Sequence, residues 1–157
     1  MKKLLKVSSV LAIFAGIIMF IGGVWGIYFT YQNISREKIV TPSDSASPNI
    51  PVVGPISLKV QADIIREHTL KTTGGKVYAE MPRQIAKLDE DGKSVLGKDG
   101  KSVMVPNTAR DMWITATTLT TALNLGILTY VFSGLITLFG LISFWNGIVF
   151  GALSKKY

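Results

Sequence analysis

The residues that could do chemistry in this chain are few, and they gather around its single histidine. His68 follows two acids, Asp63 and Glu67, and Glu80 comes next along the chain. Imidazole nitrogens and carboxylate oxygens bind divalent metals, so these four residues are the candidate metal ligands. At about 3.6 residues per turn, Asp63 and Glu67 share a helix face, whereas His68 is turned by about 100° from Glu67. This arrangement favours an exposed or interface histidine over a ligand, and no cofactor is expected.

Other reactive patterns fail on spacing. Gly-Lys-Ser occurs at Gly92 and at Gly100, but a phosphate-binding loop needs a further glycine five positions earlier, where Lys87 and Val95 stand. A calcium loop starting at Asp89 would need glutamate at its twelfth position, which is glycine. The chain has no cysteine, hence no thiol nucleophile and no disulfide. These absences predict a protein that is not an enzyme and does not bind nucleotides.

Two long uncharged segments of the chain flank the candidate metal ligands. No charged residue occurs between Lys6 and Arg36, and none between Asp111 and Lys155. Stretches of this length are typical of segments that cross a lipid bilayer. The first block is longer than the roughly 7 to 15 apolar residues of a signal peptide and lacks a cleavage site. We therefore expect a retained membrane anchor that covers residues 8–31.

The basic residues predict the orientation. Five of the positive charges belong to the two ends of the chain, at Lys2, Lys3, Lys6, Lys155 and Lys156. Positive residues flanking a span remain in the cytoplasm. The sequence therefore predicts a plasma-membrane protein with cytoplasmic tails at residues 1–7 and 153–157. Because the net charge of +7 comes largely from these tails, nucleic acid is not an expected partner.

The second uncharged block is too long for one crossing. As a single helix, residues 112–154 would extend about 65 Å, roughly twice the hydrocarbon thickness. Either a threonine-rich amphipathic stalk over 112–125 leads into a span over 126–152, or two spans turn near Ser133 and Gly134. Two spans would place Lys155 and Lys156 on the extracytoplasmic side of the membrane, against the preference of basic residues for the cytoplasm. The single protruding helix is therefore favoured.

Between the spans, residues 32–111 are expected to form an extracytoplasmic α+β domain. A helical pattern covers about 57–72 and ends at Gly74 and Gly75. Asp-Gly-Lys-Ser-Val then occurs twice within residues 88–105, where each Asp-Gly pair favours a tight hairpin turn in a small meander. The predicted fold is therefore a mainly α membrane protein: two transmembrane helices flank a small α+β domain, and the second helix is long and protruding.

Small residues recur at four-residue steps within the spans and let helix backbones approach closely. They either pack the two spans together or dock a partner, and they are the candidate helix-packing residues Ala12, Gly16, Gly22, Gly26, Ser143, Gly147 and Gly151. No charge lies inside either span, which argues against an ion path or a proton relay.

A set of short motifs lies between the two spans: Gly54-Pro55, Gln61-Ala62-Asp63-Ile64-Ile65, His68, Thr73-Gly74-Gly75-Lys76 and Tyr78-Ala79-Glu80. With these motifs the chain resembles a family of small two-span membrane proteins found mainly in actinobacteria, some named aromatic ring-opening dioxygenases. The resemblance covers both spans and the helix with its glycine turn, and excludes the repeat at about 88–105. Ring opening of that kind uses two histidines and a carboxylate, whereas this chain has one histidine.

These observations predict a non-catalytic accessory or structural subunit of a membrane protein complex, whose partners are lipid and other membrane subunits. The alternative is an extracytoplasmic module, anchored by two spans, that binds a ligand or a metal.

Overall fold

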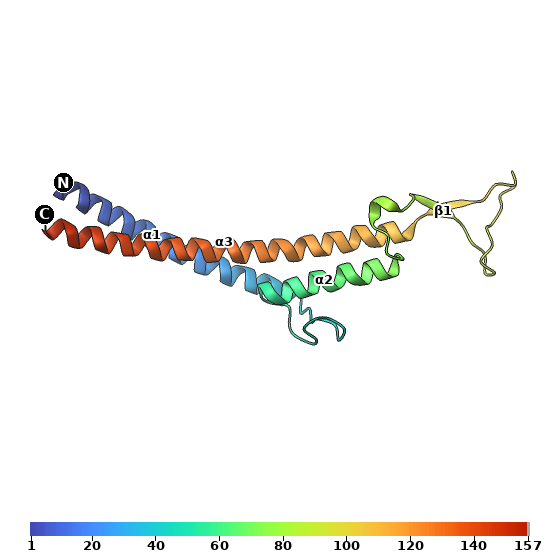
Figure 1. Ribbon diagram of the computed structural model, residues 1–157, viewed down its shortest axis with the longest axis horizontal. Coiled ribbons are helices and arrows are strands. Elements are labelled where there is room, and N and C mark those ends of the chain that lie inside the picture. The colour runs from blue at the N-terminus through green and yellow to red at the C-terminus, as the bar shows by residue number, and fades with distance from the viewer. Residues whose placement is uncertain (157) are drawn as a thin grey trace. The chain divides into compact units, whose positions relative to one another are not determined.

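The computed structural model describes residues 1–156 and is mainly helical (Figure 1). The chain divides into two compact units. The first, here called the hairpin unit, comprises Met1–Val60 and the chain from Asn124 onward, and the second, the loop unit, comprises Gln61–Leu123. In chain order the elements are α1 (Lys2–Arg36), α2 (Pro55–Thr72), the short 3-10 helix η1 (Tyr78–Glu80), β1 (Gln84–Ala86), β2 (Met104–Pro106) and α3 (Thr108–Lys156).

In the hairpin unit, α1 lies antiparallel to the C-terminal part of α3, and the two chain ends lie at the same end of the pair (Figure 1). Both helices are long and apolar enough to cross a membrane. Only 11% of the most apolar window of each helix is buried, whereas a core helix of a soluble protein would be mostly buried. Large apolar side chains, such as Phe14 on α1 and Trp145 on α3, are exposed along both helices. Helices of this kind have the surface expected in lipid.

The helices extend beyond the predicted spans. α1 begins at Lys2, because residues 2–6 of the basic tail are lysine and leucine, which are good helix formers. It continues past the predicted span to Arg36, and Lys38 then takes a positive φ angle of 50°. α3 is one helix from Thr108 to Lys156, so the alternative with a turn near residue 133 is wrong.

The loop unit contains the C-terminal part of α2, which the glycine pair ends. The N–H of Gly75 donates to the carbonyl of Leu70 at 2.7 Å, and the N–H of Gly74 donates to the carbonyl of Lys71 at 3.3 Å. Their φ angles are 79° and 64°, a conformation that glycine adopts without steric cost. The helix therefore stops where the glycine pair predicted.

The core of the loop unit forms around one tryptophan at the start of α3. The indole N–H of Trp113 donates to the carbonyl of Lys76 at 2.8 Å, and the Arg66 guanidinium lies 5.6 Å from the indole ring centre. These contacts join α2, the glycine turn and α3. The buried apolar residues of this core are Ala62, Ile64, Met81, Trp113, Ala116 and Leu123.

The repeat over residues 87–103 differs from the expected meander. β1 and β2 form a two-stranded antiparallel sheet, and beyond it the chain makes two hairpins, with positive φ at Gly92 and Gly100. Three backbone hydrogen bonds close a ring in which Lys87 donates to Val103, Val103 to Val95 and Val95 to Lys87, at 2.7, 2.8 and 2.8 Å. Each eight-residue unit returns the chain to this ring, so three arms meet at one junction.

Candidate functional site

The contact between α1 and α3 follows a seven-residue period. Small residues dominate it, so we call it the small-residue seam. A period of seven over helices of about 3.6 residues per turn is the pattern of a left-handed antiparallel pair. Its buried members are Ser9, Gly16, Gly23 and Thr30 on α1 and Ser133, Gly140, Gly147 and Ser154 on α3.

At the seam the two backbones touch. A Cβ atom added to Gly16 would lie 2.5 Å from the backbone nitrogen of Phe144, and one added to Gly140 would lie 2.6 Å from that of Phe20. Gly147 is equally confined, at 2.8 Å from the backbone nitrogen of Ile13. Real Cβ atoms essentially never lie closer than 3.0 Å to a heavy atom of a non-neighbouring residue, so these positions require glycine.

Two serine hydroxyls hydrogen-bond across the seam. Ser9 Oγ donates to the carbonyl of Gly147 at 2.7 Å, and Ser143 Oγ donates to the carbonyl of Ala12 at 2.9 Å. Interhelical bonds of this type contribute about 0.6 kcal/mol each on average in a membrane protein. Because each joins a specific pair of positions, they fix the axial register of the helices.

Most of the predicted packing residues lie on this contact. Gly26 lies against the Ser133 hydroxyl and Gly151 against the Ser9 hydroxyl. Gly22 is the exception, because no atom lies within 4 Å of a Cβ built there, and Gly23 contacts α3 instead. Four-residue steps drift off a contact line whose average period is 3.5 residues, which explains the error. The spacing of seven was the missed signal for Ser9, Gly23, Ser133 and Gly140.

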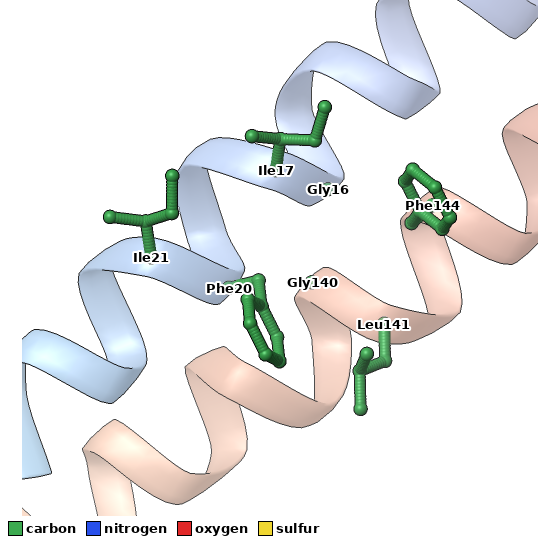
Figure 2. A pocket seen from close by; sticks show the side chains of 7 residues that line it. All are labelled: Gly16, Ile17, Phe20, Ile21, Gly140, Leu141 and Phe144. Carbon is green, nitrogen blue, oxygen red and sulfur yellow. The ribbon is translucent and has the colours of Figure 1, made fainter.

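An apolar groove of about 380 Å³ lies beside the seam where Gly16 and Gly140 meet (Figure 2). Phe20 of α1 and Phe144 of α3 stand at either end, with the two glycines between them. Its remaining walls are the aliphatic side chains of Ile17, Ile21 and Leu141. The absence of side chains at the two glycines creates the hollow, and nothing polar in its lining could hold a charged ligand.

The four candidate metal ligands are not brought together. Glu67 forms an ion pair with Lys71 at 2.7 Å, and Glu80 accepts the backbone N–H of Val77 at 2.8 Å in η1, beyond the glycine turn. Within residues 1–156, no three His, Cys, Asp or Glu residues form a group that could hold a metal ion. The structure thus offers no support for a metal centre at His68 and Asp63.

The chain matches no protein-family model, no curated protein and no solved structure. The most specific feature of the chain's own geometry is the small-residue seam with the groove beside it.

Proposed function

We propose that this chain is a non-catalytic accessory or structural subunit of a membrane protein complex. The observation that carries the proposal is the small-residue seam, which fixes α1 and α3 by backbone contact and two serine hydrogen bonds between the helices. Helices held in this way form one fixed pair. A fixed helix pair suits a subunit that positions or stabilises others.

The charge pattern supports an orientation with both termini in the cytoplasm. The lysines of both tails lie at the end of the pair where the chain begins and ends. Toward the other end of α1, Trp25 stacks on Phe29 with ring centres 5.2 Å apart, and Tyr28 and Tyr31 are exposed nearby. Aromatic side chains of this kind favour the membrane–water interface. We place the loop unit on the extracytoplasmic side of the plasma membrane.

The groove is the surface that this function assigns to a partner. The seam already occupies most of the predicted packing residues within the chain, so partner docking must use another face. The groove is apolar and lies within the uncharged stretch of each helix, which suits a large apolar side chain from a transmembrane helix of another subunit. The alternative, a metal-binding module, has no comparable support, because within residues 1–156 no three of its candidate ligands form a group that could hold a metal.

Purification from the native membrane in mild detergent, followed by mass spectrometry, tests the proposal. We expect one or more membrane proteins to co-elute at fixed stoichiometry. Ile17→Trp fills the groove and should release them, whereas Ile18→Trp, on the next residue and outside the groove, should retain them. A native protein that is monomeric in both mild detergent and lipid nanodiscs would refute the accessory role.

A further inference from the structure

A second concave site lies in the loop unit, where α3 begins. It has a volume of about 180 Å³, and two arginines, Arg83 and Arg110, line it together with Tyr78 and Asn107. One acid, Asp111, lies in the same lining, so the positive groups outnumber the negative. The two arginines are far apart along the chain and no motif joins them, so the sequence alone does not predict the pair.

Arg110 is held in place before any ligand arrives. Its guanidinium carbon lies 4.0 Å from the centre of the Tyr78 ring, and Nη1 donates to the carbonyl of Met81 at 3.0 Å. A guanidinium group has five N–H donors in one plane, so this bond leaves most of them for another acceptor. A side chain that is already fixed loses little entropy on binding.

The backbone carries Arg83 to the same place. The carbonyl of Arg83 accepts the N–H of Asn107 at 3.1 Å, and the Asn107 side-chain amide donates to the carbonyl of Pro82 at 3.0 Å. These bonds tie the segment before β1 to the start of α3. Among residues 1–156, neither Arg83 nor Arg110 forms an ion pair with a carboxylate. Two guanidinium groups thus share one concave site without a protein carboxylate bound to either.

The start of α3 adds to the positive character of the site. Asn107 Oδ1 accepts the N–H of Ala109 at 3.1 Å, as an N-cap residue does. The first turn of a long helix carries partial positive charge, which favours a bound anion. This contribution strengthens the attraction of the two arginines and is secondary to it.

We propose that Arg83 and Arg110 bind a phosphate group between them. A guanidinium fork binds phosphate through paired hydrogen bonds, and two forks are better matched by the several oxygens of phosphate than by one carboxylate. The phosphate belongs either to a dissolved phosphate compound or to a phospholipid headgroup. This binding activity goes beyond the accessory role and does not depend on it.

The test uses the full chain in a mild detergent that carries no phosphate group, with inorganic phosphate as the probe in isothermal titration calorimetry. Arg83→Gln should weaken phosphate binding about tenfold or more. Arg66→Gln is the matched control, because it removes the same charge from the loop unit outside the site and should leave the affinity unchanged. Arg110→Lys keeps the charge but loses the planar fork, and should also weaken binding.

A second arm separates the two sources of phosphate. Nanodiscs containing phosphatidic acid should raise the thermal unfolding midpoint of the unmodified chain but not of Arg83→Gln if the headgroup is the ligand. If a dissolved compound is the ligand, only added phosphate should raise it. Circular dichroism must show that Arg83→Gln is folded. Failure of both probes to bind, or equal loss with Arg66→Gln, would overturn the proposal without touching the accessory role.

Discussion

Gly140 offers a direct test of the small-residue seam, because one added methyl group meets backbone atoms there. A Cβ atom at this position would lie 2.6 Å from the nitrogen and 3.0 Å from the Cα of Phe20. Ordinary contact begins at 3.4 Å, so α1 and α3 must separate by about 0.8 Å, the difference between 3.4 and 2.6 Å, to accept Gly140→Ala. No side chain can rotate away to relieve this clash.

The cost follows from that displacement. Separation by this amount stretches the hydrogen bonds of Ser9 and Ser143, now 2.7 and 2.9 Å long, to the limit of hydrogen bonding or beyond it. Their loss costs about 0.6 kcal/mol each, and overpacking a tight contact costs about 1–3 kcal/mol. We therefore expect Gly140→Ala to lower the free energy of unfolding of the helix pair by about 2–4 kcal/mol.

Thermal unfolding of the full chain in mild detergent, followed by circular dichroism, measures this effect. Gly134→Ala is the control, since it lies in the same helix with no atom within 4 Å of its added Cβ. Alanine favours helix over glycine, so the control should be neutral or slightly more stable. Equal unfolding midpoints for the two variants would show that the backbones do not touch at the seam.

Two further predictions follow from the same geometry. Ser9→Cys combined with Gly151→Cys should form a disulfide under mild oxidation in this cysteine-free chain. A Cβ on Gly151 lies 3.9 Å from that of Ser9, a separation that suits a disulfide. The disulfide is detected as a shift in gel mobility. The same shift with Ser8→Cys in place of Ser9→Cys would contradict the axial register of α1 against α3. Gly75→Val should destabilise the loop unit by about 1–2 kcal/mol, because a β-branched residue is strained at a φ of 79°. Gly54→Ala is the comparison for that melting experiment, since Gly54 has open space and no positive φ, and equal midpoints would refute the strain.

The sequence predicted most of what local pattern controls. Uncharged length identified both long helices, and the pair Gly74 and Gly75 marked the end of α2, because positive φ angles favour glycine. Four-residue steps found Gly16 and Gly147 but chose Gly22 over Gly23. Only the partner helix determines which of two adjacent glycines is buried. The seven-residue spacing of the buried residues on α1 selects Gly23.

Features that depend on distant contacts were beyond the sequence. Arg83 and Arg110 share a site because Asn107 bonds to the backbone at Pro82 and Arg83, and no local propensity encodes that pairing. The same limit applies to the candidate metal ligands, since helical spacing relates Asp63 to Glu67 but cannot place Glu80. Helical periodicity relates residues within one element, whereas a binding site usually combines several.

The ring of hydrogen bonds at Lys87, Val95 and Val103 sets a limit on how this segment can change in length. In an open solenoid, another copy of the repeat adds to the end and leaves its neighbours as they were. Here each junction residue donates its backbone N–H to one member of the ring and accepts at its carbonyl from the other, so no backbone N–H is left for a fourth. Duplication of one eight-residue unit would therefore have to break one of these three bonds to enter the ring.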